Sequence, residues 1–431
     1  MKKLKKNKEI LLVGIIFALI TFISLFIRFW NYQELVNFFG DPPFFLHEVK
    51  DMVESGKPRL VGPMVLSKVT LGRGFFTGPV FYYLLAILGI LFNWNVFLIT
   101  GFFTFLFIGI FGLIFFWLKR RYGQLIALVI YAILSFLPLF IPYSRLMWNP
   151  HLLPLFGVLL FWTLEERRRR LRNYLLVGLF FGLGLSAHYS ALLWLLIIIY
   201  YFTVDLRERA FSFLNWALFC LGTVIAESPF LIFELRHNFY NLRTVIFQIK
   251  YFKLSPGYTF NLSYYYYYFS LLPLACKLYA IFLKTVGKNF LLEKIMLFFN
   301  LILVLVLLFF SLGPSREVVF YPKGWSIKTQ QKVVEMIISD NEENFEVATT
   351  IDSDTRAGEL RWWLRQKGIK VMAVEDYDKA KILYLVAPKS RPPETESVWE
   401  VRTLRPFEIV FNKDLGNGLI FYKLVRVISE R

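Results

Sequence analysis

Residues 1–30, MKKLKKNKEILLVGIIFALITFISLFIRFW, join a basic head to an apolar stretch of about twenty residues. A stretch of that length crosses ~30 Å of hydrocarbon as an α-helix. It is longer than the ~7–15-residue core of a signal peptide, and no small-residue cleavage site follows it. We therefore expect an uncleaved first membrane helix over about 10–30, with its lysines holding the N-terminus in the cytoplasm.

The rest of the 431-residue chain is equally apolar, with 57% hydrophobic and 19% aromatic residues and a mean hydropathy of +0.52. A soluble globular chain has nearer ~45–50% apolar residues. The formal net charge of +18 suggests nucleic acid at first, but most basic clusters adjoin apolar runs, where Lys and Arg set membrane orientation. The composition predicts a polytopic α-helical membrane protein with no nucleic-acid partner.

The positive-inside rule predicts about nine spans, a cytoplasmic N-terminus and an extracytoplasmic tail. The segment 79–94 is apolar but short, and we expect an interfacial or re-entrant helix there. The predicted spans are 10–30, 96–118, 124–142, a return span ending at EERRRRLR (165–172), two short spans within 174–203, then 213–233, 263–283 and 290–313.

Composition changes sharply after the last span. We expect a transmembrane domain over 1–313, with a first outer loop at 31–95, and a small extracytoplasmic α/β domain over 314–431. The predicted helix of this domain is AGELRWWLRQKG (357–368). Its predicted strands are FEVATTI (345–351), KVMAV (370–374), KILYLV (381–386), FEIVF (407–411) and GLIFYKLV (418–425).

The predicted topology gathers most chemically versatile side chains on the outer face, whereas the cytoplasmic loops are short and mainly basic. Any chemistry of the membrane domain is therefore expected outside. The residues placed there are Asp41, Glu48, Asp51, Arg145, Glu227, Glu234, Arg236 and all four histidines, His47, His151, His188 and His237.

Asp41 lies in the stretch FGDPP, which two readings fit. It is either a turn residue before prolines or a general base at the border of lipid and water. Glu48 and Asp51 most simply form the solvated face of an amphipathic helix. A metal site with His47 is the weaker alternative because the spacing is not diagnostic, so no cofactor is assigned and a divalent metal is not expected.

Three further residues keep a structural and a functional reading. Arg145 ends a predicted span and either extends to an aromatic interface or binds a phosphate. His188 lies within an apolar run. It is either a hydrogen-bonded group between two helices, or it contacts a phosphate or carries a proton. Glu227 is the acid deepest in an apolar run and is either paired or functional.

The sequence has no Walker loop, no GxGxxG after a strand, no HExxH and no CxxC pair. These absences argue against an ATP-driven pump, a dinucleotide enzyme and a zinc protease.

The order of outer-face motifs resembles a known family. The early Asp41 is followed by TGPVFYYLLAILGILF (77–92), LKRRYG (118–123), YSRLMWNPHLLPLF (143–156) and LGLSAHYSALL (183–193). This order is similar to that of the C-type superfamily of membrane glycosyltransferases, particularly the branch of protein O-mannosyltransferases and aminoarabinose transferases in glycosyltransferase family 39. The resemblance covers residues 10 to about 245, and the tail contributes nothing to it.

The resemblance implies roles position by position. Asp41 occupies the place of the catalytic base, and Arg145 that of an arginine at the phosphate of the lipid donor. His188 and Tyr189 fall near the same phosphate, while Gly78, Pro79, Tyr82 and Tyr83 match an amphipathic juxtamembrane helix that shapes the site. The other residues expected to bind substrate are Glu48, Asn149, Glu227, Arg236 and His237.

The chain departs from the family pattern at two positions. Many relatives have Asp-Glu where this chain has Asp41-Pro42, which puts a metal role in doubt. His188 replaces a lysine, so a permanent cation becomes a titratable one and activity is expected to fall at high pH.

The resemblance implies transfer of a sugar from a polyprenyl-phosphate donor to a protein, lipid or glycan acceptor. The departing phosphate would be stabilised by cations, and Asp41 would deprotonate the acceptor hydroxyl with inversion at the anomeric carbon. Two alternatives from other classes remain: a lipid or sugar transporter or flippase, and a non-catalytic membrane assembly protein. A transporter would favour related halves and broken helices near the midplane, and the sequence shows no internal repeat.

Overall fold

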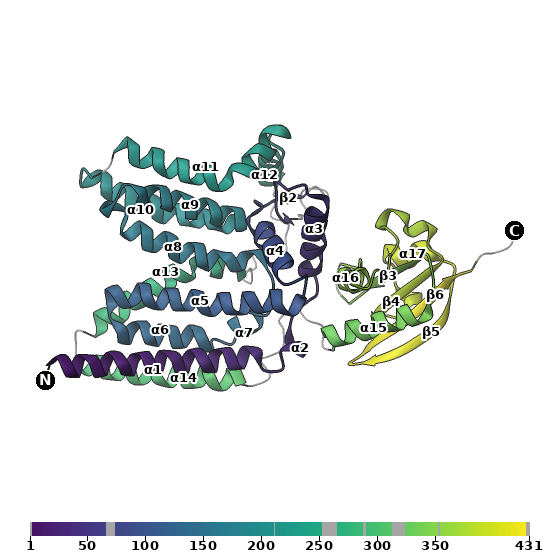
Figure 1. The fold of residues 1–431 in the computed structure, drawn as a ribbon, viewed down its shortest axis with the longest axis horizontal. Helices are drawn as coiled ribbons and strands as arrows, with labels where there is room; N and C mark the ends of the chain where they lie inside the picture. Colours follow the sequence, from purple (N-terminus) through teal and green to yellow (C-terminus); the bar gives the residue numbers. More distant parts are fainter. Residues whose placement is uncertain are drawn as a thin grey trace. The chain divides into compact units, whose positions relative to one another are not determined.

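The structure is a computed structural model that describes residues 2–65, 74–210, 212–251, 265–287, 290–312, 324–351 and 354–427. The chain divides into two compact units. The first contains Met1–Arg28 and Val49–Gly313, and we call it the helical unit. The second combines Phe29–Glu48 with Pro314–Arg431, and we call it the sheet unit (Figure 1).

The helical unit is a bundle of α-helices with a two-stranded antiparallel ribbon of β1 (Met64–Val65) and β2 (Phe75–Phe76) (Figure 1). Helix α3 (Asp41–Ser55) begins among the residues of the sheet unit and ends among those of the helical unit. The other helices of the bundle are α1 (Lys2–Phe29), α4 (Val80–Leu91), α5 (Val96–Tyr122), α6 (Gln124–Phe136), α7 (Phe140–Tyr143), η2 (Asn149–Leu152), α8 (Leu153–Glu165), η3 (Arg167–Arg169), α9 (Arg172–Ala187), η4 (Tyr189–Leu193), α10 (Trp194–Arg207), α11 (Phe213–Arg236), α12 (Tyr240–Tyr251), α13 (Tyr265–Val286) and α14 (Phe290–Leu312).

Six helical segments of the described chain are long and apolar enough to cross a membrane. They are Asn7–Phe29, Val96–Tyr122, Tyr189–Arg207, Phe213–Arg236, Tyr267–Val286 and Lys294–Leu312. The chain is therefore a multi-pass membrane protein, as its composition predicts. Helices α4, α6 and α9 are apolar but shorter, and the 12 residues of α4 extend only ~18 Å.

Helices α9 and α11 pack with their backbones in close approach. A Cβ atom at Gly178 would lie 1.9 Å from the carbonyl oxygen of Phe219, and one at Gly222 would lie 2.1 Å from that of Leu175. Only glycine leaves this space, and small residues are the usual means of close helix association in membranes. The apolar run 174–203 divides at His188 into α9 and η4–α10, as its length predicts.

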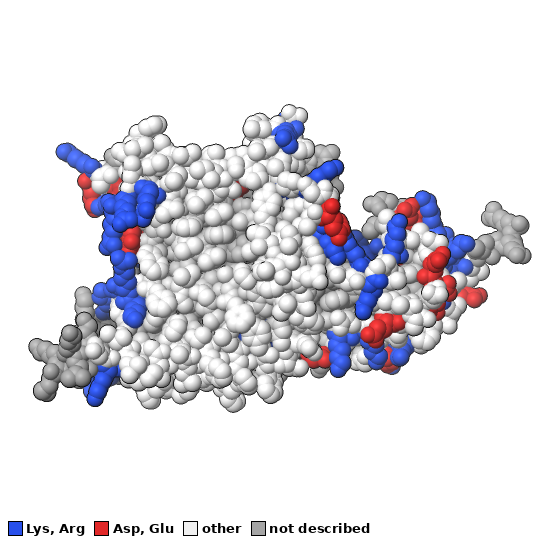
Figure 2. All heavy atoms as spheres, in the orientation of Figure 1, with Lys and Arg blue, Asp and Glu red and all other residues white. Residues whose placement is uncertain are grey.

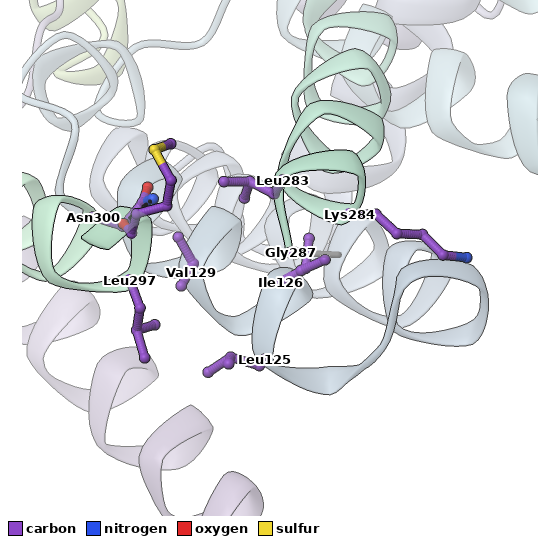
Figure 3. Close-up of a pocket in the computed structure, with 9 residues that line it drawn as sticks. Leu125, Ile126, Val129, Leu283, Lys284, Gly287, Leu297 and Asn300 are labelled. Atoms are coloured by element: carbon purple, nitrogen blue, oxygen red, sulfur yellow. Dashed lines mark hydrogen bonds between the residues drawn. The ribbon is translucent and has the colours of Figure 1, made fainter. Parts of the chain in front are cut away.

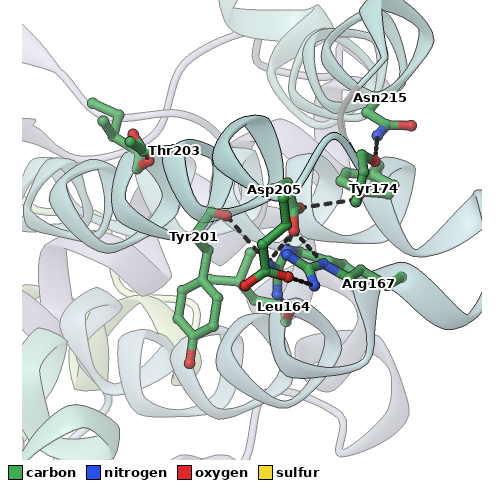
Figure 4. A network of polar contacts seen from close by, with 11 residues as sticks. Leu164, Arg167, Tyr174, Tyr201, Thr203, Asp205 and Asn215 are labelled. Atoms are coloured by element: carbon green, nitrogen blue, oxygen red, sulfur yellow. Dashed lines mark hydrogen bonds and ion pairs between the residues drawn. The ribbon is translucent and has the colours of Figure 1, made fainter.

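Basic side chains gather at the end of the helical unit where α5 ends and α10 ends, while the flank along the helices carries few charges (Figure 2). A buried ion-pair network lies at this end (Figure 4). Arg167 Nε donates to Asp205 Oδ2 at 2.6 Å, and Tyr174 Oη donates to the same oxygen at 3.0 Å. The guanidinium of Arg167 also donates to the carbonyls of Leu164 at 3.0 Å and Tyr201 at 3.1 Å. The network thus joins α8, α9 and α10.

The sheet unit has a four-stranded sheet in the order β3-β4-β6-β5. β3 (Phe345–Thr349) and β4 (Ile382–Pro388) are parallel, and β6 (Leu419–Arg426) pairs antiparallel with both β4 and β5 (Phe407–Gly416). Separate apolar clusters cover the two faces of the sheet. The helices of this unit are α2 (Tyr32–Leu35), α15 (Ile327–Asp340), α16 (Gly358–Gln366), η6 (Val374–Lys379), η7 (Pro393–Thr395) and α17 (Trp399–Leu404).

One predicted strand is wrong. Residues 370–373 of KVMAV are irregular and Val374 begins η6. The Met372 amide donates to the carbonyl of Phe345 in the edge strand β3 at 3.3 Å, and the Met372 carbonyl accepts from Arg361 Nη1 at 2.8 Å. The side chain of Arg361 thus uses the Met372 carbonyl, which a strand at 370–374 would need for a backbone hydrogen bond to a neighbouring strand. The predicted helix at 357–368 and the other four strands are confirmed.

Candidate functional site

Asp41 is the first residue of α3 and lies in the sheet unit. Gly40 before it has a φ of +71°, a left-handed conformation that lets the chain turn sharply into the helix. Pro42 and Pro43 fill the first helical turn, where their missing N–H groups cost nothing, and both are buried. The side chain of Asp41 is exposed, and the N-terminus of a helix favours a negative charge. This arrangement presents a carboxylate on the surface at the start of α3, and its role as a general base stays a prediction.

Glu48 lies two helical turns after Asp41, on the same side of α3. It is half-buried and lies close enough to Arg356 of the sheet unit for the two charges to interact. The same guanidinium covers the ring of Phe44, with Cζ 4.2 Å from the ring centroid. A role for Glu48 in substrate binding stays a prediction.

Arg145 is fully buried in the helical unit between α7 and η2. Its Nε donates to the carbonyl of Arg28 and its Nη2 to that of Ile27, both at 2.8 Å. These carbonyls belong to the last turn of α1, where intrahelical donors are missing and a cation is favoured. Arg145 therefore caps α1, and its predicted contact with a phosphate is a further role that the structure leaves as a prediction.

We expect Arg145→Lys to lower the midpoint of thermal unfolding in detergent. A lysine keeps the charge but cannot reproduce the fork that reaches both α1 carbonyls, and each hydrogen bond to a charged group contributes about 1.5–3 kcal/mol. Arg243→Lys, on an exposed position of α12, is the matched control and should leave the midpoint unchanged. An unchanged midpoint in Arg145→Lys would show that the cap contributes little.

Arg28 is a candidate residue that the sequence interpretation missed. It is fully buried, and its Nη1 donates to Ser24 Oγ at 2.6 Å and to the Ser135 carbonyl at 2.9 Å. Within the described residues it forms no ion pair, and its Nε and Nη2 have no hydrogen-bond partner. Arg145 binds the backbone carbonyl of Arg28, so two buried arginines neighbour each other in the fold. The signal was present as an arginine inside the apolar window SLFIRFW (24–30).

A second cluster of candidate residues forms where β2, η4, α11 and α12 meet. Tyr189 Oη donates to the carbonyl of Phe76, whose amide donates to Asn241 Oδ1 at 2.7 Å. Glu234 Oε1 accepts from the backbone N–H of Asn241 at 3.0 Å, so it holds the start of α12. Glu227 is half-buried, and it and Glu234 are near enough to act electrostatically on the Tyr189 hydroxyl. The structure thus brings together two predicted residues, Tyr189 and Glu227.

His188 and Asn149 lie at the end of α9. Asn149 Nδ2 donates to the carbonyl of Ala187 at 2.7 Å, and the Ser190 amide donates to His188 Nδ1 at 3.1 Å. An Nδ1 atom that accepts a hydrogen bond carries no proton, so the ring is neutral in this arrangement. His188 can then offer a proton from Nε2, and its role at the phosphate of a donor stays a prediction.

The segment before α4 packs tightly on the end of α9. A Cβ atom at Gly78 would lie 2.1 Å from Ser186 Oγ, and this hydroxyl accepts from the Val80 amide at 3.2 Å. Tyr82 is buried, and Tyr83 Oη donates to the Arg59 carbonyl at 2.7 Å. Tyr82 and Tyr83 therefore anchor this part of the helical unit, and contact with substrate stays a prediction for both.

Arg236 and His237 are exposed at the end of α11. The ring of His237 stacks on Phe233 with the centroids 4.1 Å apart, and its Nδ1 lies 2.9 Å from the Phe233 carbonyl. Within the described part of the chain, neither side chain forms a hydrogen bond or ion pair with the cluster around Tyr189.

A cavity of about 190 Å³ lies elsewhere, between α6, α13 and α14 (Figure 3). Its lining is mainly aliphatic, with Lys284 and Asn300 as the polar members, and it contains none of the predicted site residues. Asp41 and Glu48 belong to the sheet unit and the other predicted residues to the helical unit, so their convergence on one cavity stays a prediction. Among the described residues, no group of three His, Cys, Asp or Glu side chains is placed to hold a metal ion.

Comparison with known proteins identifies the fold of this chain through a solved structure. No family model matches the chain, and no curated protein sequence matches it either. The crystal structure of ArnT from Cupriavidus metallidurans bound to undecaprenyl phosphate matches with a TM-score of 0.55 and 12% sequence identity. The match covers 98% of this chain and 99% of that chain. The chain therefore has the C-type glycosyltransferase fold that its motif order suggested, with a small C-terminal α/β domain.

The structural match extends further along the chain than the resemblance in sequence motifs. The sequence motifs ended near residue 245, and the tail contributed nothing to them. A match over 98% of the chain necessarily includes most of the C-terminal sheet as well. At 12% identity the fold is retained while short sequence patterns are lost, which explains why the tail gave no signal.

Proposed function

We propose that this protein transfers a sugar from a polyprenyl-phosphate donor to an acceptor hydroxyl. The observation that supports the proposal best is the fold match over nearly the whole of both chains to ArnT, whose structure holds undecaprenyl phosphate. A match limited to the helices would equally suit other membrane proteins. A match that extends through the C-terminal sheet favours a shared architecture of catalytic domain and appended domain.

In the proposed reaction Asp41 is the general base. Its exposed carboxylate takes the proton from the acceptor hydroxyl while the acceptor oxygen bonds to the anomeric carbon. The bond between that carbon and the phosphate oxygen breaks, and its electron pair leaves with the polyprenyl phosphate. Attack from the side opposite the leaving group inverts the anomeric carbon. Asp41 then returns its proton to water.

The departing phosphate gains negative charge, so the donor site needs a positive field. We assign this field to Arg145 together with Arg28, two buried arginines of which the first binds the backbone carbonyl of the second, in surroundings of low dielectric. His188 takes part as a neutral Nε2–H donor, since its Nδ1 is occupied as an acceptor. Tyr189 lies next to it in the chain and joins the same proposed phosphate site.

The remaining candidates are proposed to orient the sugar and the acceptor: Glu48, Tyr82, Tyr83, Asn149, Glu227, Arg236 and His237. We place the reaction on the extracytoplasmic face of the cell membrane, with the N-terminus inside. The basic end of the helical unit supports this orientation, because Lys and Arg mark cytoplasmic loops (Figure 2). The proposal requires neither a nucleotide sugar nor a cofactor.

The test uses the full chain in proteoliposomes with a radiolabelled undecaprenyl-phosphate sugar and, as acceptors, the separated lipid, glycan and protein fractions of a cell envelope. We expect release of undecaprenyl phosphate together with label in one fraction, and no labelling when a nucleotide sugar replaces the lipid donor. Movement of the donor between leaflets without cleavage would instead support a flippase. If the donor is neither cleaved nor moved between leaflets when every fraction is supplied, the remaining interpretation is a non-catalytic assembly protein.

A further inference from the structure

The four residues before Gly40 are buried in the sheet unit. Val36 and Phe38 have no exposed surface, and Asn37 and Phe39 are 2% and 7% exposed. Phe39 belongs to the apolar cluster that covers one face of the sheet, where it lies with Trp325 and residues of α15 and α16. The segment that leads to the proposed base is thus part of the core of the C-terminal domain.

A pair of side-chain hydrogen bonds fixes the backbone of this segment. Gln330, which is fully buried on α15, donates from Nε2 to the carbonyl oxygen of Phe38 at 3.0 Å. The Oε1 atom of the same amide accepts from Trp363 Nε1 of α16, also at 3.0 Å. The amide of Gln330 is therefore held at both ends, and it can donate to Phe38 in only one orientation.

Aromatic contacts hold the same segment from the side. The ring of Phe38 meets those of Trp363 and Trp362 edge-on, with centroids 5.3 Å and 6.3 Å apart. Beyond Asp41, the ring of His47 lies edge-on to Trp362 at 5.3 Å, and its Nε2 lies 3.2 Å from the Gly358 carbonyl. The backbone is thus anchored to α16 on both sides of Asp41.

We propose that Gln330 and the neighbouring Trp363 are positioning residues for Asp41, and that the C-terminal domain thereby sets the place of the catalytic base. The inference rests on the proposed function for its catalytic part. Asp41 comes three positions after Phe38, a span of at most ~11 Å, so a shift at the anchored carbonyl is transmitted to the carboxylate. A misplacement of ~1 Å at a reacting group can cost ~10²-fold in rate.

The first test is Gln330→Leu in the full chain, assayed in proteoliposomes with the undecaprenyl-phosphate sugar. We expect kcat to fall about 10-fold to 100-fold while KM for the donor stays within about twofold. The proposed phosphate site, Arg145 with Arg28, belongs to the helical unit and does not include Gln330. Trp363→Phe keeps a ring against Phe38 but loses the bond to Gln330, and we expect a smaller fall. Gln33→Leu, exposed on α2 of the same unit, is the matched control and should leave kcat unchanged.

A double-mutant cycle separates positioning from a general loss of structure. If Gln330 acts through Asp41, then Gln330→Leu will lower the residual rate of Asp41→Asn by less than twofold, on the order expected for coupled sites. An equal fall in both backgrounds would overturn the proposal, since Gln330 would then act without Asp41.

Hydrogen exchange of the backbone amides of residues 36–40 tests the anchoring without any need for activity. We expect faster exchange in Gln330→Leu than in the wild type or in Gln33→Leu, because the Phe38 carbonyl loses its donor. Unchanged exchange would overturn the anchoring. A wild-type chain that transfers no sugar while this exchange responds would overturn the proposed function alone.

Discussion

Asp41→Asn should lower sugar transfer by about 10²–10⁴-fold, the usual contribution of a general base. The amide has nearly the same shape as the carboxylate but cannot accept the proton of the acceptor hydroxyl. Asp41 is exposed and does not contribute to the apolar core, so the variant should fold normally. Initial rates of undecaprenyl-phosphate release measure the loss, and binding of undecaprenyl phosphate to the variant should match the wild type.

The control for this variant is Asp51→Asn. Asp51 lies on the same helix α3, is exposed like Asp41 and loses the same charge on substitution. We expect its rate to stay within about twofold of the wild type, as for a group outside the transition state. If the two variants lose activity equally, or if Asp41→Asn keeps full activity, Asp41 is not the base.

Asp205→Ala should lower the free energy of unfolding by about 3–5 kcal/mol, the usual loss when one partner of a buried ion pair is removed. The Asp205 carboxylate accepts from Arg167 Nε at 2.6 Å and from Tyr174 Oη at 3.0 Å (Figure 4). It also pairs with Arg168. Its removal leaves Arg167 with a buried charge and no carboxylate partner among the described residues. Thermal unfolding of the purified protein in detergent measures the change.

Glu208→Ala is the matched control for the ion-pair network. Glu208 pairs with the same Arg168, but its side chain is 55% exposed, and exposed ion pairs contribute only about 0–1 kcal/mol. A small shift for Glu208→Ala beside a large one for Asp205→Ala would show that burial, and not charge alone, gives the network its importance. Equal shifts would contradict that assignment.

Much of the helical unit could be predicted because hydrophobic length is a local property. The run 174–203 is too long for one helix, and it does divide at His188. The segment 79–94 is too short to span, and α4 has only 12 residues. The orientation of the termini and the number of spans rest on charge patterns and stay predictions.

The rest of the candidate site depends on contacts that no local pattern shows. Phe38 and Gln330 are 292 residues apart, so nothing in the stretch VNFF (36–39) indicates that it belongs to the core of the C-terminal domain. Arg28 resembles any arginine at the end of a span, and only the structure shows it buried beside Arg145. The strand predicted at 370–374 is wrong because of another such contact: the Arg361 side chain donates a hydrogen bond to the carbonyl of Met372.

The discontinuous make-up of the sheet unit bears on the biosynthesis of the protein. The ribosome makes Phe38 and Phe39 early, but their partners Gln330 and Trp363 emerge about 290 and 325 residues later. Until then two large apolar side chains lack the core that buries them, and such exposed apolar surface favours aggregation. The core of the sheet unit can therefore close around Phe38 and Phe39 only after the C-terminal part of the chain has been made.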